Sequence, residues 1–129
     1  MSAFLHNPNL GEIGQIALTV GDLERAVIFY RDTLGLQLLF KAPPAMAFFA
    51  CGSIRLMLSQ GEKLEGNRYG GVVYFKVARI QDSYDALVAR GATFEKEPHL
   101  IAKMPDHELW MAFLRDPDQN VLALMCEKR

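Results

Sequence analysis

The sequence has few features of a secreted or membrane protein. Only two of its 129 residues are cysteines, Cys51 and Cys126, and they lie far apart. Such sparse cysteine usage, and an N-terminus with no signal-peptide pattern, predict the reducing cytoplasm. No apolar run approaches the roughly 20 residues of a transmembrane helix, because Arg55, Lys76 and Arg115 interrupt the longest candidates. We therefore expect a cytoplasmic protein with no membrane partner.

An excess of charge of one sign is also lacking. Lysine and arginine number 14 against 15 aspartates and glutamates, for a formal net charge of -1, and neither sign forms a block. Because nucleic acids are bound through concentrated positive charge, we expect no nucleic-acid partner. Half of the residues are hydrophobic, enough to bury a core in a chain of this length. We predict a single domain over residues 1–129.

The first half of the chain shows hydrophobic periodicity of both kinds. A helix is predicted from Asp22, a residue suited to capping its N-terminus, to about Gly35, because apolar residues recur there at spacings of three and four. Apolar runs bounded by turn residues predict strands over residues 13–20, 36–40, 46–51 and 54–59. The order of elements is β-α-β-β-β.

The second half repeats this order. A second helical stripe runs from Ile80 to Val88 and closes at Gly91. Strands are expected over residues 72–77, 93–96, 108–115 and 121–125. The last two are joined by Asp116-Pro-Asp-Gln-Asn120, which predicts a hairpin, because proline presets the first turn dihedral and Asn120 can tolerate a left-handed backbone. We therefore predict an α+β fold of two paired βαβββ modules, about 12–60 and 70–127, whose curved sheets surround a central cavity with the helices outside.

Two stretches resemble the vicinal oxygen chelate superfamily, which includes glyoxalases, bleomycin resistance proteins and extradiol dioxygenases. The segment 15–26, with Phe-Tyr-Arg at 29–31 and Leu-Gly-Leu at 34–36, is similar to the opening module of glyoxalase I relatives. The segment 113–122 is similar to their closing hairpin. The resemblance spans roughly residues 12–127. It implies the paired-module fold, but one scaffold hosts many reactions.

In that superfamily, a divalent ion held by histidine, glutamine and glutamate side chains polarises substrate oxygens as a Lewis acid. The resemblance places the ligand positions on Gln15, Met57 (or Leu56, if the register slips by one), Val72 and Ala123. Only Gln15 carries a hard donor, and one amide oxygen does not hold such an ion. We therefore expect no metal at these positions and no other cofactor.

Strand alternation, anchored on those positions, predicts which side chains line the cavity. Arg55 and Tyr74 join Gln15 as its polar groups. An inward Arg55 needs a carboxylate, for which Glu62, Glu65 or a ligand acid are candidates, whereas a shift of one residue turns it to solvent. The expected substrate-binding residues are Gln15, Arg55, Met57, Val72, Tyr74, Met111, Phe113 and Ala123.

The segment 98–108 holds two of the three histidines, His99 and His107. We predict His107 at the mouth of the cavity as a catalytic acid or base, since its ordinary pKa lies near working pH, although an ordinary loop histidine is an alternative. His99 and His107 could also form a relocated metal site with Asp106 or Glu108. Adjacent residues of a strand face opposite ways, which disfavours that site unless the strand starts later or bulges.

These observations predict a small-molecule binding protein or metal-independent enzyme of the superfamily, acting on a small carbonyl- or carboxylate-bearing compound between the modules. Whether there is turnover stays open. One alternative is a divalent-metal-dependent lyase, isomerase or dioxygenase with displaced ligands, and another is a drug-sequestering resistance protein. The resemblance implies a homodimer, and the modules could pair within one chain or between two.

Overall fold

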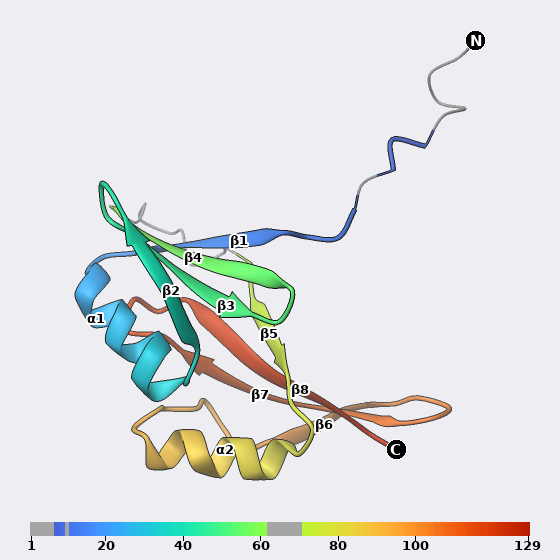
Figure 1. The fold of residues 1–129 in the computed structure, drawn as a ribbon. Coiled ribbons are helices and arrows are strands. Elements are labelled where there is room, and N and C mark those ends of the chain that lie inside the picture. Colours follow the sequence, from blue (N-terminus) through green and yellow to red (C-terminus); the bar gives the residue numbers. More distant parts are fainter. Residues whose placement is uncertain (1–6, 10, 62–70) are drawn as a thin grey trace.

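A computed structural model describes residues 7–9, 11–61 and 71–129 and confirms the predicted fold class. The chain forms two four-stranded sheets, each with its own helix (Figure 1). The first module contains β1 (Gln15–Val20), α1 (Leu23–Ile28), η2 (Phe29–Thr33), β2 (Gln37–Ala42), β3 (Met46–Cys51) and β4 (Ile54–Gln60). The second contains β5 (Val73–Lys76), α2 (Ile80–Ala89), β6 (His99–Lys103), β7 (Glu108–Arg115) and β8 (Val121–Lys128).

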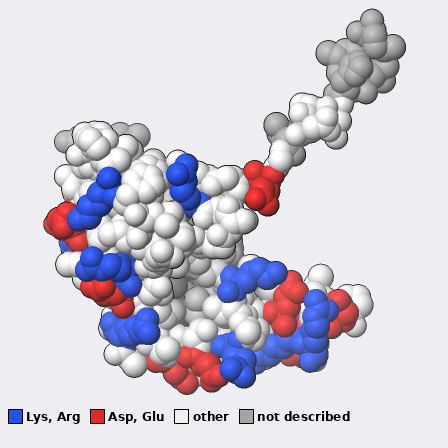
Figure 2. Space-filling model, in the orientation of Figure 1, with Lys and Arg blue, Asp and Glu red and all other residues white. Residues whose placement is uncertain are grey.

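The two sheets have the same topology. Sheet A has the strand order β1-β4-β3-β2, and sheet B has the order β5-β8-β7-β6. The first strand of each module runs parallel to the last, and the remaining pairs are antiparallel. No helix in the described part of the chain is long and apolar enough to span a membrane. Acidic and basic side chains are interspersed on the face shown in Figure 2.

The first helix begins and ends as its sequence predicts. The Asp22 side chain accepts a hydrogen bond of 3.1 Å from the Arg25 amide, which caps the N-terminus. After Ile28 the helix widens into the π-helical segment η2, and Tyr30 in this segment is fully buried. The chain then leaves the helix at Gly35, whose φ of 79° is one that glycine adopts without strain.

One hydrophobic core joins the two modules. The helix-side face of sheet A, with Phe49, Leu56 and Leu58, packs into the same buried cluster as Leu114 and Leu122 of sheet B. A smaller cluster, formed by Ile80, Ala112, Leu124 and Cys126, lies under α2. The modules are therefore held together through the helix-side faces of both sheets, by burial of apolar surface.

The prediction of a strand over residues 93–96 is wrong. Phe94 makes only an isolated bridge with Leu114, and the strand that pairs with β7 is β6. The exposed Glu-Lys-Glu at 95–97 has no apolar side chain to bury, and Pro98 has no N–H to donate to a ladder. Pairing therefore resumes at His99.

The aspartate-rich hairpin between β7 and β8 has a structural role. Asp116, only 2% exposed, accepts hydrogen bonds from the amides of Asp118 and Asn120 and from the Asn120 side chain, each at 2.8 Å. The residue with a left-handed backbone is Gln119, with a φ of 70°, and not Asn120, which could also tolerate it. Asn120 instead uses its own N–H and amide group to satisfy the buried carboxylate.

The same hairpin contacts the first module. Asp118 Oδ1 accepts hydrogen bonds from the Gly21 amide at 2.7 Å and from Arg25 Nη2 at 3.1 Å. The side-chain amide of Asn120 donates to the Thr19 carbonyl at 3.1 Å. These contacts hold the turn that precedes α1 against the hairpin of sheet B.

Candidate functional site

Each sheet has a face turned away from its helix, which we call its open face. On sheet A, Gln15 lies in register with Arg55, and Ala17 lies in register with Met57. Gln15, Arg55 and Met57 therefore share the open face, because residues in register on neighbouring strands point the same way. Gln15 Nε2 lies 3.8 Å from the sulfur of Met57.

Arg55 is exposed on this face. Its guanidinium carbon lies 5.5 Å from the centre of the Phe48 ring, an arrangement that suits a cation–π contact. Among the described residues, no carboxylate forms an ion pair with Arg55. The two acidic partners predicted from the sequence, Glu62 and Glu65, lie outside the described residues. Arg55 therefore offers hydrogen-bond donors to an anion in solution.

The open face of sheet B carries aromatic side chains. Tyr74, Ala123 and Phe113 lie side by side on β5, β8 and β7. The ring of Tyr74 meets that of Phe113 edge-on, with centroids 6.3 Å apart and an interplanar angle of 77°. Tyr74 is 46% exposed, and Val72, just before β5, is 36% exposed. Half-buried Met111 lies two residues before Phe113 on β7 and therefore on the same face.

His99 belongs to this face, although it is not among the predicted substrate-binding residues. It lies in register with Met111, and its ring centroid is 6.4 Å from that of Phe113. Strand alternation would have indicated its direction if β6 had been recognised. Placing the strand at residues 93–96 left His99 in a loop, where no periodicity applies.

His107 lies in the turn before β7, so alternation along that strand does not set its direction. Its Nδ1 lies 2.8 Å from the carboxylate of Asp106, which Arg129 also contacts at 2.8 Å. The hydrogen bond from Arg129, followed by that from His107, holds the pKa of Asp106 below its usual value. The strand begins at Glu108, so the exception stated for a later strand start applies, and strand geometry does not separate His107 from Asp106.

The cavity next to His107 is separate from the other predicted residues. It has a volume of about 560 Å³ and lies at the end of the β6–β7 hairpin. Its other lining residues are Lys103, Met104, Asp106, Glu108, Lys128 and Arg129. None of the eight substrate-binding candidates lines it, so the single chain does not bring His107 to them.

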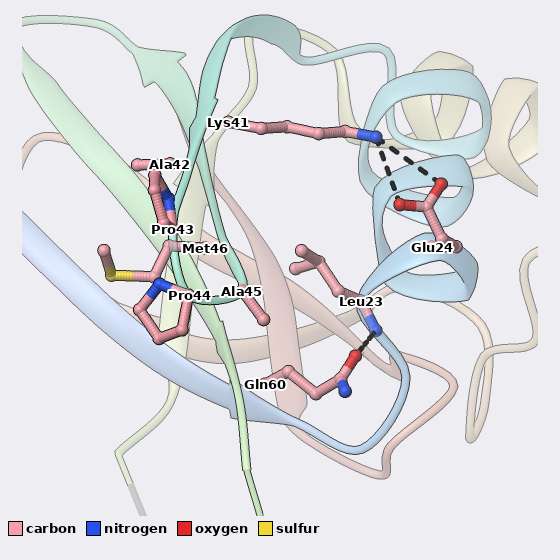
Figure 3. Close-up of a pocket in the computed structure, with 9 residues that line it drawn as sticks. All are labelled: Leu23, Glu24, Lys41, Ala42, Pro43, Pro44, Ala45, Met46 and Gln60. Atoms are coloured by element: carbon pink, nitrogen blue, oxygen red, sulfur yellow. Dashed lines mark hydrogen bonds and ion pairs between the residues drawn. The ribbon is translucent and has the colours of Figure 1, made fainter.

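A cavity of about 460 Å³ near the β2–β3 turn is shown in Figure 3. Its polar groups are already paired with one another. Gln60 Oε1 accepts a hydrogen bond of 2.7 Å from the Leu23 amide, and Lys41 forms an ion pair of 3.2 Å with Glu24. None of the predicted site residues lines it.

Among the described residues, the open faces of the two sheets do not line a common cavity. The helix-side faces share a core, so the open faces are the ones left outside it. Of four surface cavities among the described residues, counting the two above, none is lined by residues from both open faces. One ligand can therefore contact Arg55 and Tyr74 together only where the open face of sheet A meets that of sheet B from another chain.

Comparison with known proteins agrees with this architecture. Residues 12–124 match the model of the Glyoxalase/Bleomycin resistance protein/Dioxygenase superfamily. The chain belongs to this superfamily. It is 30% identical to "Uncharacterized protein YraH" of Bacillus subtilis (strain 168), over 85% of this chain and 94% of the relative. It is 29% identical to "Probable lactoylglutathione lyase" of Vibrio cholerae serotype O1, over 87% of this chain and 88% of the relative.

A solved structure supports the fold. The crystal structure of lactoylglutathione lyase from Agrobacterium tumefaciens superposes with a TM-score of 0.70 at 23% identity, covering 92% of this chain and 95% of that one. At this identity the likeness shows that the two proteins share the paired-module fold of the superfamily.

The residues at the metal-ligand positions that the family resemblance implies do not fit a divalent ion. Gln15 lies beside the thioether of Met57, whereas Val72 and Ala123 carry only hydrocarbon. Among the described residues, no three His, Cys, Asp or Glu side chains gather where they could hold an ion. Hard divalent cations need several oxygen or nitrogen donors, and these side chains do not supply them.

Proposed function

We propose that this superfamily member binds a small, partly apolar carboxylate or carbonyl compound on its open faces, without a metal at the superfamily's ligand positions. Gln15, Arg55 and Met57 would contact the ligand from sheet A. Val72, Tyr74, Met111 and Phe113 would contact it from sheet B, above the fully buried Ala123. His107 lines a separate cavity of the chain, so a role as catalytic acid or base would require the partner protomer to bring it to the ligand. The observation that carries the proposal is the exposed Arg55 guanidinium without a carboxylate partner among the described residues.

The charge and shape of the two faces support this ligand class. A carboxylate can take two parallel hydrogen bonds from a guanidinium, and a carbonyl oxygen can accept one from the Gln15 amide. The exposed ring of Tyr74 against Phe113 offers an apolar surface for the rest of the molecule. A lining of apolar side chains with a small number of polar groups is typical of small-molecule sites.

We further propose that the site is completed by a second copy of the chain, with sheet A of one protomer facing sheet B of its partner. The shared core on the helix side supports this arrangement, because it leaves both open faces outside it. Apolar side chains that one protomer exposes, such as Tyr74 and Val72, would then be covered in the dimer.

The test of ligand class is a calorimetric titration with phenylpyruvate, which carries a carboxylate, a ketone and an aromatic ring. Wild-type protein should bind it, and Arg55→Gln should bind it roughly ten- to a hundredfold more weakly, because a hydrogen-bonded ion pair is lost. Arg31→Gln is the matched control, since exposed Arg31 pairs only with its neighbour Asp32. Equal binding by Arg55→Gln and wild type would refute the role of Arg55.

Mixing two variants tests the shared site. Arg55→Gln and Tyr74→Ala should each bind phenylpyruvate poorly as homodimers. When they are unfolded and refolded together, each heterodimer has one intact site, so about a quarter of the wild-type sites should return. Recovery in the mixture supports a site between protomers. Sedimentation as a monomer, or no recovery in a proven heterodimer, contradicts it.

The named Vibrio cholerae relative favours a second candidate, a metal-dependent lactoylglutathione lyase. This function needs donors that Val72 and Ala123 do not supply. An assay with methylglyoxal, glutathione and added nickel or zinc discriminates the two candidates. Metal-stimulated formation of lactoylglutathione would establish the lyase and overturn the metal-independent proposal.

A further inference from the structure

A groove of about 330 Å³ separates α2 from the junction between η2 and β2. Leu34 and Leu36 form one side, Phe75 and Leu124 lie on sheet B, and Leu87 projects from α2. The groove shares no residue with the site proposed on the open faces.

The helix presents polar groups at the rim of the groove. Ser83, Ala86, Leu87 and Arg90 lie at spacings of three and four, so they occupy one side of α2 and its C-terminal cap. No aspartate or glutamate is among the described residues that line the groove. The charge at this rim is therefore positive, above an apolar floor.

Arg90 extends from the end of α2 toward the opposite wall. Its Nη1 lies 3.1 Å from the point that a Cβ atom on Gly35 would occupy, so the guanidinium reaches the junction that follows η2. Because Gly35 has no side chain, the Arg90 guanidinium has room to lie against it. Arg90 thus brings a cation beside Leu34 and Leu36, across the groove from its own helix.

Arg90 also differs from most arginines of this protein. Five described arginines form ion pairs with carboxylates: Arg25, Arg31, Arg79, Arg115 and Arg129. Within residues 7–9, 11–61 and 71–129, only Arg55 and Arg90 have no carboxylate partner. Arg55 belongs to the open face, and Arg90 stands over an apolar groove.

We propose that this groove is a second ligand site, for a small amphipathic carboxylate. The carboxylate would accept hydrogen bonds from the Arg90 guanidinium, with the Ser83 hydroxyl available as a further donor. The hydrocarbon tail would cover the partly exposed Leu34 and Leu36 above the buried Leu124, and remove their remaining exposed surface from water. The single sign of charge at the rim selects an anion, and the apolar floor selects against inorganic phosphate.

The test is an NMR titration of the full chain with octanoate, using 1-octanol and inorganic phosphate as comparison ligands. Octanoate should shift the amide signals of Leu34, Leu36 and Leu87 and leave those of Tyr74 and Phe113 unchanged. Octanol should bind about tenfold more weakly, because it lacks the charge that pairs with Arg90. Phosphate at the same concentration should cause no shift in the groove.

Two variants separate the role of Arg90 from a general loss of charge or stability. Arg90→Gln should weaken octanoate binding about tenfold, whereas Arg79→Gln, at the other end of α2, should not change it. Ala86→Glu places a carboxylate on the groove side of an exposed helical position and should weaken binding similarly while the fold is retained. The proposal is wrong if wild type does not bind octanoate, if Arg90→Gln binds like Arg79→Gln, or if octanol or phosphate gives the same shifts.

Discussion

The hydroxyl of Tyr30 donates a hydrogen bond of 2.7 Å to Oδ2 of Asp116. The two residues come from different modules, and both are almost completely buried. Because Asp116 also accepts hydrogen bonds from its own hairpin, this contact ties the π-helical segment of the first module to the closing hairpin of the second. A buried carboxylate that is fully hydrogen-bonded stabilises the fold, whereas one that loses a donor destabilises it.

Replacing Tyr30 with phenylalanine should therefore lower the free energy of unfolding by about 1–3 kcal/mol. The substitution removes only the hydroxyl and leaves a buried carboxylate oxygen with one donor fewer. Tyr84→Phe is the matched control, because Tyr84 packs against Phe94 through its ring. The measurement is urea denaturation of both variants at neutral pH. Equal stability of the two variants would show that the Tyr30 hydroxyl contributes nothing.

The same hydrogen bond predicts how stability depends on alkaline pH. Burial, followed by the nearby Asp116 carboxylate, raises the pKa of Tyr30 far above its ordinary value of about 10. Above that pH the unfolded chain loses the Tyr30 proton and the folded chain keeps it, so stability falls by about 1.4 kcal/mol per pH unit.

Tyr30→Phe lacks this ionisation. The difference in free energy of unfolding between wild type and Tyr30→Phe should therefore shrink from pH 9.5 to about pH 11, two values that span the ordinary tyrosine pKa of about 10. Urea unfolding at the two pH values measures the difference. A constant difference would mean that Tyr30 ionises equally in the folded and unfolded states, and a difference that grows with pH would mean that its pKa is lower in the folded state.

Gly21 is required because of the close approach of Asp118. A Cβ atom at Gly21 would lie 2.8 Å from Asp118 Oδ1. This oxygen accepts hydrogen bonds from the Gly21 amide and from the Arg25 guanidinium. Gly21→Ala should destabilise the protein by about 1–3 kcal/mol, because the carboxylate must move. Gly14→Ala, with no atom within 4 Å of its Cβ, is the control in thermal unfolding. Similar melting temperatures for the two variants would contradict the clash.

The role proposed for His107 can be separated from a structural one. His107→Ala should weaken phenylpyruvate binding roughly ten- to a hundredfold if the imidazole bonds the ligand. Its pair with the exposed Asp106 contributes little to stability, so the melting temperature should change little. Asp106→Asn keeps the imidazole but alters its partner and should have a smaller effect. Unchanged binding with a markedly lower melting temperature would make His107 structural.

The protein should purify with far less than one equivalent of zinc, nickel, manganese or iron after dialysis without chelator. The reason is that Met57, Val72 and Ala123 supply no oxygen or nitrogen donor at the superfamily's positions. Elemental analysis of the dialysed protein gives the metal content. A stoichiometric metal, with loss of folding or activity on chelation, would establish a site built from other residues.

Local pattern in the sequence determined the order of the elements. The apolar stripe between Asp22 and Gly35, and the second one from Ile80, required helices that bury one side. Period-two alternation, anchored on the positions that the family resemblance implies, predicts that Gln15, Arg55 and Met57 share one face, and the pairing of β1 with β4 agrees with that assignment. The helices and the strand faces depend on the spacing of apolar residues along the chain, which a single sequence contains.

Tertiary structure decided where the alternation stops and which faces meet. His99 lies in a strand because β6 pairs with β7 from His99 onward, and His107 lies in the turn before β7. This pairing is a long-range contact, and the local sequence of the charged segment 95–97 does not predict it. The hairpin motif carries a buried carboxylate whose partner, Tyr30, is 86 residues away in sequence. The common core of the helix-side faces leaves both open faces outside it, because burial of apolar surface between the modules depends on how they pack and not on either module's own periodicity.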